Sequence, residues 1–156
     1  MKKIRRGVGA IIFCPKKNYE YLLIKKSSIS DTSDGKPIPI KSFWDIPKGG
    51  VKNRENSKSA IIRELKEELG SDNFKIFKKI KEKLIFKFEG EIAEKIDFDR
   101  QETKIFLVEF LGDLDEIKLD KNEIKDFMIL DYDKAIEKIK YDETKNFFKK
   151  YAKLSH

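Results

Sequence analysis

Hydrophobic and polar residues form short runs along most of the chain, and these runs are typical of β-strands. Runs rich in β-branched and aromatic residues predict strands at residues 8–13, 21–24, 43–47, 104–111 and 124–130. Residues 74–88 alternate over a longer stretch, which predicts two strands with a break near residues 80–83. Pro15 and Asn18 predict a turn after the first strand, and the segments 27–42 and 89–101 predict loops.

Helical spacing replaces this pattern in three segments. From Ser57 onward the apolar residues fall on one helical face, namely Ile61, Ile62, Leu65 and Leu69, and Gly70 predicts a C-terminal cap. Asp131 and Asp142 predict the N-caps of two further helices, at residues 132–140 and 142–152. Strands and helices mix without a linker or a repeat, so we expect one domain over residues 1–156. Its class is α/β, with a mixed sheet between helices.

Composition narrows the class of partner. The 156 residues include 35 basic and 28 acidic side chains, which gives a net charge of +7. A mildly positive field favours anionic partners such as phosphate esters, nucleic acid or acidic lipid, without choosing among them. Charged residues reach 40%, but hydrophobic residues still make up 39% and recur along the whole chain, so we expect a folded core.

Cysteine and histidine are almost absent, which excludes several kinds of site. Cys14 is the single cysteine and His156 the single histidine, so an intramolecular disulfide, a His/Cys metal site and a His-dependent triad are excluded. We expect Cys14 to be a small buried apolar residue. Any metal must be held by carboxylates, as Mg²⁺ or Mn²⁺ are. No apolar run approaches the roughly 20 residues of a membrane span. No signal peptide is evident, so we expect a cytoplasmic protein.

The chemically informative segment lies at residues 49–70. Glu64, Glu67 and Glu68 are spaced i, i+3 and i+4, so they share one face of the predicted helix. The apolar stripe lies about a third of a turn away, so the helix can dock on a sheet and still present three carboxylates. Converging oxygens are what a hard divalent cation needs. A glutamate-rich helix is often only a solvated face, but here the spacing of eight residues is met together.

This segment resembles the signature of the Nudix family. The matching residues are Gly49, Glu55, Arg63, Glu64, Leu65, Glu67, Glu68 and Gly70. Ser71 departs from the signature, because an aliphatic residue is expected there. The lead-in Trp-Asp-Ile-Pro-Lys-Gly at residues 44–49 is also similar to family members. The resemblance implies an α/β/α sandwich around a central mixed β-sheet. It also implies a metal-dependent hydrolase that cleaves a pyrophosphate linkage in a nucleoside diphosphate derivative.

The resemblance also assigns roles within the segment. It implies that Glu64, Glu67 and Glu68 bind Mg²⁺ or Mn²⁺ with a backbone carbonyl near Lys48 or Gly49, and that Glu68 is the essential ligand. Arg63 is expected to orient a glutamate. The remaining signature residues support the motif: Glu55 at the helix start or at a further metal, Gly49 and Gly50 in a tight turn that approaches a phosphate or metal, and Gly70 at the cap.

Other candidates lie outside the signature. Glu123 and, less favourably, Glu102 are candidates for a further metal ligand or the general base. Lys48 and Lys104 are candidates to bind substrate phosphate. Trp44 is expected in the core rather than stacked on a base, and the core is also expected to hold Phe86, Phe88 and Phe106.

The signature leaves the substrate open. The lead-in is similar to diadenosine polyphosphate hydrolases and to RNA 5′ pyrophosphohydrolases, and the favoured substrate is a dinucleoside polyphosphate such as diadenosine tetraphosphate. The alternatives are an RNA 5′ end, a nucleoside triphosphate removed from the nucleotide pool, or ADP-ribose. A different class is a non-catalytic module that binds a nucleotide or RNA, but the complete set of glutamates favours an enzyme. Monomer and homodimer both remain open.

Overall fold

The computed structural model describes residues 3–29, 38–87 and 98–153. Its strands are β1 (Lys3–Cys14), β2 (Glu20–Ile29), β3 (Ile38–Asp45), β4 (Lys48–Gly50), β5 (Phe74–Lys87), β6 (Phe98–Phe110) and β7 (Ile124–Leu130). Its helices are α1 (Ser57–Leu69), α3 (Tyr132–Lys138) and α4 (Asp142–Tyr151). None of the helices within these ranges has the length and apolar character needed to cross a membrane.

The strands form one mixed sheet, as the sequence predicts. Its main order is β3-β2-β1-β6-β5, while β4 pairs with β1 and β7 pairs with β2. β1 and β6 run parallel, and the other pairs are antiparallel. β1 therefore occupies the centre, with β6 on one side and β2 and β4 on the other.

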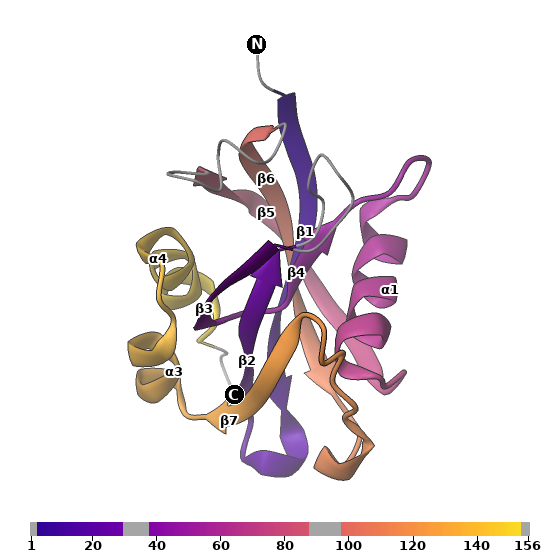
Figure 1. Cartoon of the computed structure of the whole chain (residues 1–156). Helices are drawn as coiled ribbons and strands as arrows, with labels where there is room; N and C mark the ends of the chain where they lie inside the picture. The colour runs from indigo at the N-terminus through magenta and orange to yellow at the C-terminus, as the bar shows by residue number, and fades with distance from the viewer. Residues whose placement is uncertain (1–2, 30–37, 88–97, 154–156) are drawn as a thin grey trace.

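Helices cover both faces of this sheet (Figure 1). Side chains of a strand alternate between the two faces. Val8, Ala10 and Ile12 of β1 pack in one core cluster with the buried face of α1. Ile11 and Phe13 belong to a second cluster that includes α3 and α4. The two clusters on opposite sides of β1 confirm the expected α/β/α sandwich.

The helix α1 begins and ends as its sequence predicts. The Asn56 side chain accepts a hydrogen bond from the Ser59 amide, and Gly70 closes the helix in the left-handed region with φ of 68°. A Cβ at Gly70 would lie 2.5 Å from the Lys118 carbonyl oxygen, so both the conformation and the packing require glycine. The predicted apolar face is wrong at Ile62, which is 52% exposed.

Several strands extend beyond the boundaries that the sequence predicts. The predicted loop 27–42 overlaps the end of β2 and the start of β3, because Ser28 and Ile29 pair with Pro39 and Ile38. The predicted loop 89–101 overlaps the start of β6 at Phe98. Residues 30–37 and 88–97, including Phe88, lie outside the described ranges.

Three other predictions concern β5 and the C-terminal helices. β5 is a single strand, but its register with β6 shifts between Lys79 and Lys83, where the break is predicted. The Asp131 side chain accepts from the Lys134 amide and caps α3, as predicted. The predicted cap at Asp142 is wrong, because Tyr141 is the N-cap and Asp142 is the first helical residue. α3 also ends at Lys138, earlier than expected.

Candidate active site

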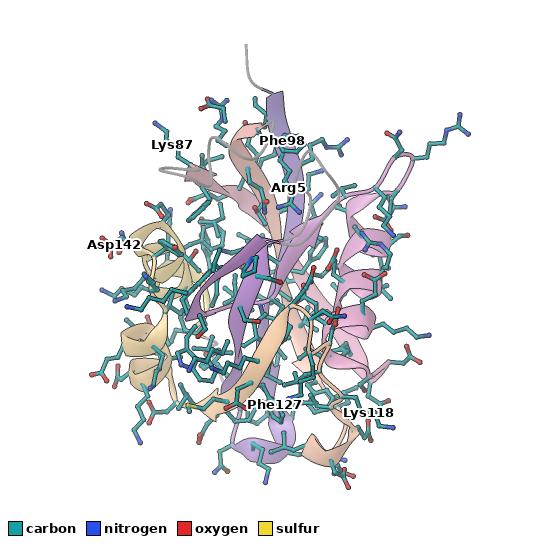
Figure 2. All side chains as sticks on the ribbon, in the orientation of Figure 1. Arg5, Lys87, Phe98, Lys118, Phe127 and Asp142 are labelled. Atoms are coloured by element: carbon teal, nitrogen blue, oxygen red, sulfur yellow. The ribbon has the colours of Figure 1, made fainter. Side chains whose placement is uncertain are left out.

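A cavity of about 1150 Å³ lies beside α1 and β4. Six of the described glutamates line it, namely Glu55, Glu64, Glu67, Glu68, Glu123 and Glu143. Basic residues from several elements also line it: Arg5, Arg6, Lys26, Lys52, Arg54 and Lys87. Figure 2 shows Arg5, Lys87 and Phe98 together at one end of the sheet. The cavity therefore combines a cluster of carboxylates with a cationic surround.

Glu68 is the most buried of these glutamates. It is 2% exposed, and among the described residues its Oε2 atom has no hydrogen-bond partner. Burial raises the pKa of the Glu68 carboxyl well above its usual range. The Lys26 ammonium opposes this rise, while the Glu64 and Glu123 carboxylates add to it. The side chain is thus an oxygen donor held in a site that disfavours its charge.

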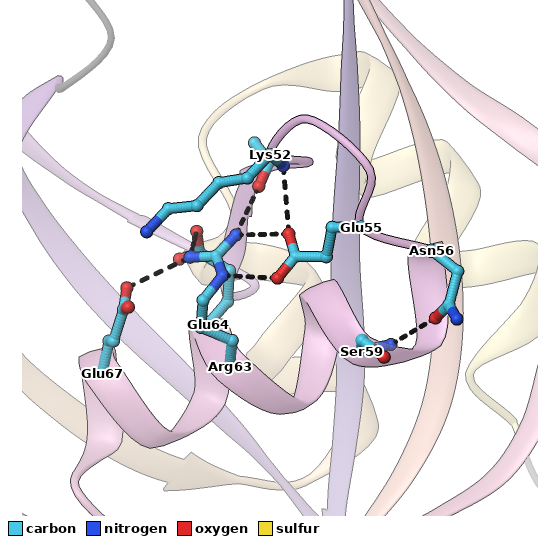
Figure 3. A network of polar contacts seen from close by, with 8 residues as sticks. Lys52, Glu55, Asn56, Ser59, Arg63, Glu64 and Glu67 are labelled. Carbon is cyan, nitrogen blue, oxygen red and sulfur yellow. Dashed lines mark hydrogen bonds and ion pairs between the residues drawn. The ribbon is translucent and has the colours of Figure 1, made fainter.

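Arg63 organises the acidic residues around it (Figure 3). Its Nε and Nη2 atoms donate to the two Glu55 carboxylate oxygens at 2.8 and 2.9 Å. Its Nη1 atom donates to Glu64 at 2.9 Å and to Glu67 at 3.2 Å, and Nη2 also donates to the Gly50 carbonyl at 2.9 Å. One guanidinium therefore fixes three carboxylates and connects α1 to β4, the geometry expected of an orienting residue.

Glu55 is held by two donors. Hydrogen bonds from Arg63 and from the Lys52 amide lower the pKa of the Glu55 carboxyl to about 2. The same contact with Glu55 raises the pKa of Arg63. Glu55 precedes α1, and its oxygens are engaged by these donors. This arrangement fits the expected support of the helix start better than a direct metal contact.

The Gly49–Gly50 pair forms part of a strand, which corrects the expected tight turn. Val8 and Gly7 of β1 pair with Gly49 and Gly50 across the antiparallel ladder. The expected close approach is present, but it is to a carboxylate of α1. A Cβ at Gly49 would lie 2.0 Å from the Glu64 Cδ atom. Gly49 therefore makes room for the Glu64 carboxylate.

The segment before β7 brings Glu123 to the cavity. The Asp120 amide donates to the Glu68 carbonyl at 3.1 Å, and the Glu123 amide donates to the Asp120 carbonyl at 3.0 Å. These bonds place the Glu123 carboxylate close enough to Glu68 to raise the pKa of the Glu68 carboxyl. The other acidic candidate, Glu102, is not among the cavity-lining residues. It contacts Arg100 at 3.2 Å and Lys83 at 3.7 Å.

Lys48 lies in the cavity wall, but its ammonium is already engaged. Its Nζ atom is 3.1 Å from Asp45 Oδ2 and donates to Thr144 Oγ1 of α4 at 2.8 Å. Burial lowers the Lys48 pKa, while Asp45 opposes the change. Because α4 and α1 cover opposite faces, Lys48 points away from Glu64. Lys48 therefore connects β4 to α4 through its hydrogen bond to Thr144, which differs from its expected role as a phosphate ligand.

Lys104 departs from its expected role more clearly, because it does not line the cavity. It lies on β6 opposite Lys83 of β5. The nearby Lys79 ammonium is the largest influence on Lys104 and lowers its pKa. Lys104 thus lies outside the cavity, in a group of cations on the sheet that includes Lys79, Lys83 and Arg6.

Aromatic residues that the sequence analysis did not place in the site also line the cavity. The Tyr141 ring lies 5.0 Å from the Phe43 ring and 5.1 Å from the Phe86 ring, both in edge-to-face geometry. Phe86 is thus a wall residue rather than a core residue. No spacing links these three aromatics, so the sequence offers no signal for them. Trp44 is outside the lining, and Phe106 and Cys14 are buried as expected.

Whether the site suits a divalent metal depends mainly on the carboxylate oxygens of α1. Among the described residues, no group of three Asp, Glu, His or Cys side chains already surrounds one point. Glu64 and Glu67 instead face Arg63. The orphaned Glu68 Oε2 atom is nevertheless a buried donor without a partner in the described ranges, and Glu64 and Glu123 are close to it. An all-oxygen donor set fits Mg²⁺ or Mn²⁺.

A family model described as NUDIX domain matches residues 3–151. The chain belongs to the Nudix family. It is 31% identical over 154 residues to an RNA pyrophosphohydrolase of Campylobacter jejuni subsp. doylei, covering 97% of this chain and 92% of that protein. A second RNA pyrophosphohydrolase, from Nitratiruptor sp., is 33% identical over 126 residues, with 78% and 73% coverage. The family match and these relatives identify an enzyme, a Nudix pyrophosphohydrolase.

Solved structures agree with this Nudix fold. An Ap4A hydrolase binary complex from C. elegans has a TM-score of 0.68 and 20% identity, covering 95% of each chain. A MutT protein from Methanosarcina mazei has a TM-score of 0.68 and 23% identity, covering 97% of this chain and 94% of the other. At these identities the likeness establishes the fold.

Proposed function

We propose that this Nudix enzyme removes pyrophosphate from the 5′-triphosphate end of RNA in a reaction that depends on Mg²⁺ or Mn²⁺. The substrate is inferred from the sequence similarity to RNA pyrophosphohydrolases, which extends over 92% of the Campylobacter protein. The cationic residues around the cavity favour binding of an RNA 5′ end, which carries a triphosphate followed by the backbone phosphates. RNA, one of the alternatives named in the sequence analysis, thus replaces the dinucleoside polyphosphate as the favoured substrate.

The buried glutamates provide the oxygen donors for this reaction. Glu68, Glu64 and Glu123 would hold the divalent cation, and Glu67, which is half exposed, can turn from Arg63 toward it. The cation, when bound, neutralises the developing charge on the phosphate oxygens and lowers the pKa of a bound water. Arg63 keeps the Glu64 carboxylate oriented. Glu123, the acid outside the helix, would serve as a metal ligand or as the base that accepts a proton from water.

Aromatic and basic residues would hold the rest of the substrate. Arg6 and Lys26 are among the cations that line the cavity and would bind the phosphate chain. The Phe43, Phe86 and Tyr141 rings offer apolar surface on the other side of β4. A nucleobase stacked on such rings gains about 1–3 kcal/mol.

Dinucleoside polyphosphates are the second candidate. The observation in their favour is the size of the cavity, about 1150 Å³, which exceeds what a single nucleotide needs. Both candidates present a 5′-linked polyphosphate to the same carboxylates, and they differ in what the polyphosphate is attached to.

A side-by-side assay decides between them. Purified enzyme is incubated with Mg²⁺ and either a 5′-triphosphate RNA or diadenosine tetraphosphate, and the products are separated by chromatography. We expect faster release of pyrophosphate and 5′-monophosphate RNA. A higher kcat/KM for release of ATP and AMP from the dinucleotide would refute the RNA assignment. A chelator and Glu68→Gln should each abolish most of the turnover, whichever substrate is preferred.

A further inference from the structure

Three lysines and one arginine gather on the face of the sheet that α1 covers. Lys83 of β5 pairs with Lys104 of β6, and Lys79 pairs with Phe106. Lys104 in turn pairs with Val8 of β1, two residues after Arg6. Val8 and Phe106 both pack in the core cluster of α1, so the alternation of side chains puts all four cations on this face. We call Lys79, Lys83, Lys104 and Arg6 the basic strip.

The basic strip is electrostatically unfavourable in the protein alone. Lys79 is the largest influence on Lys104 and lowers its pKa, and burial, Arg6 and Lys83 lower it further. Like charges on directly opposite strand residues destabilise a sheet. Among the described residues, the acidic side chain that forms an ion pair with the strip is Glu102. It contacts Lys83 at 3.7 Å but also contacts Arg100 at 3.2 Å. One shared carboxylate leaves most of this positive charge uncompensated.

The basic strip is continuous with the active-site cavity. Arg6 belongs to both, and Ile85 and Lys87 of β5 line the cavity two and four residues after Lys83. Neighbouring strands are about 4.8 Å apart, so the strip extends roughly 10 Å from β1 to the edge strand β5. It lies on the same face as Glu64 and Glu68, which α1 presents. An extended polyanion that leaves the cavity can therefore follow the strip without crossing the sheet.

We propose that the basic strip binds the phosphodiester backbone of an RNA substrate downstream of its 5′ end, an inference that rests on the proposed function. Each lysine would neutralise a backbone phosphate, without reading the bases. A dinucleoside polyphosphate would not reach past the cavity to the outer residues Lys79 and Lys83. The strip thus favours longer RNA over small nucleotides by affinity, while the carboxylates perform the hydrolysis.

The test uses the double variant Lys79→Gln/Lys83→Gln and a matched control, Lys125→Gln/Lys134→Gln. The control removes the same charge from exposed residues of β7 and α3. Binding of a 5′-hydroxyl RNA of about 12 nucleotides, a length typical of single-strand sites, is measured against salt concentration. Counterion release gives a slope of about −0.7 per neutralised phosphate for single strands. We expect the slope of the strip variant to be shallower by about 1.4 and its Kd near 0.1 M salt to rise roughly 10- to 30-fold.

Turnover separates the inference from the proposed function. The KM of the strip variant should rise for a 5′-triphosphate RNA of the same length, while kcat and the kinetics on a 5′-triphosphate dinucleotide stay as in the wild type. A Kd and slope equal to those of the control variant would overturn the role of the strip, as would a wild-type enzyme that fails to bind the 5′-hydroxyl RNA. If wild-type enzyme binds this RNA through the strip but releases no pyrophosphate from the triphosphate form, the proposed function fails instead.

Discussion

Replacing Glu68 with Gln should stabilise the metal-free protein while it destroys activity. The Glu68 side chain is 2% exposed, its Oε2 atom lacks a hydrogen-bond partner in the described ranges, and Glu64 and Glu123 add negative potential. A glutamine of the same shape carries no charge into this site, and its amide can donate to the Glu64 carboxylate. The residue required for activity therefore lowers the stability of the folded protein.

The size of the effect follows from the negative charge that the buried Glu68 carboxylate carries above its pKa, a cost that protonation removes. An unpaired buried polar group costs about 1–3 kcal/mol, which is a lower limit for a charged group. For a domain of this length each kcal/mol shifts Tm by roughly 2–4 °C, so we expect a rise of about 2–12 °C. Because the pKa of Glu68 is raised in the folded state, the unfolded chain releases its proton first as pH rises above about 4.3. The wild type thus loses stability toward neutral pH, and the difference from Glu68→Gln vanishes near pH 4.

The assay is thermal unfolding in a chelator between pH 4 and pH 8, with Glu67→Gln as the control. Glu67 is 52% exposed, so its replacement should change stability by less than about 0.5 kcal/mol. Adding Mg²⁺ should stabilise the wild type and leave Glu68→Gln nearly unchanged. A Glu68→Gln protein that is less stable than the wild type at pH 8, or a gain that does not depend on pH, would refute the argument.

Three further substitutions test the surroundings of the site. Gly49→Ala should lower kcat roughly 100-fold with the fold intact by circular dichroism, because its Cβ would displace the Glu64 carboxylate; normal kcat would contradict this packing. Arg63→Lys should lower kcat and cost about 1–3 kcal/mol in urea unfolding, since an ammonium cannot replace a guanidinium that bonds to several acceptors. Lys48→Met should cost about 3–5 kcal/mol, because the buried Asp45 carboxylate loses its counterion and keeps only the hydrogen bond from the Ile46 amide. Adding Asp45→Asn should recover much of this loss, and an unchanged stability with a raised KM would restore the phosphate role.

Features encoded by neighbouring residues are the ones that the sequence predicts well. The limits of α1 depend on the Ser57 start and the Gly70 cap, and both lie within the same contiguous segment. The pairing of Arg63 with Glu67 follows from their spacing along one helix. The cap of α3 by Asp131 is likewise local. For these features a single segment contains all the interacting groups, so no knowledge of the remaining fold is needed.

Features that depend on strand register are the ones that the sequence leaves out. Gly49 and Gly50 look like a turn until β1 supplies the partner that makes them a strand. Lys104 looks like a phosphate ligand until its pairing with Lys83 places it beside β5, outside the cavity. A shift of one residue would send each side chain to the other face of the sheet. Nothing in the chain near either residue specifies that register.

Side chains of a strand alternate between the two faces of the sheet, so the short strand β4 can contribute residues to both sides of the cavity. Gly49 faces α1 and leaves space for the Glu64 carboxylate, whereas Lys48 faces α4 and bonds to Thr144. The carboxylates thus lie on one face of the sheet, and the Tyr141 ring next to α4 lies on the other. Since β4 pairs only with β1 among the described strands, the cavity can pass around it. A substrate that joins a polyphosphate to a nucleoside matches this division, because its anionic part and its aromatic part need different surroundings.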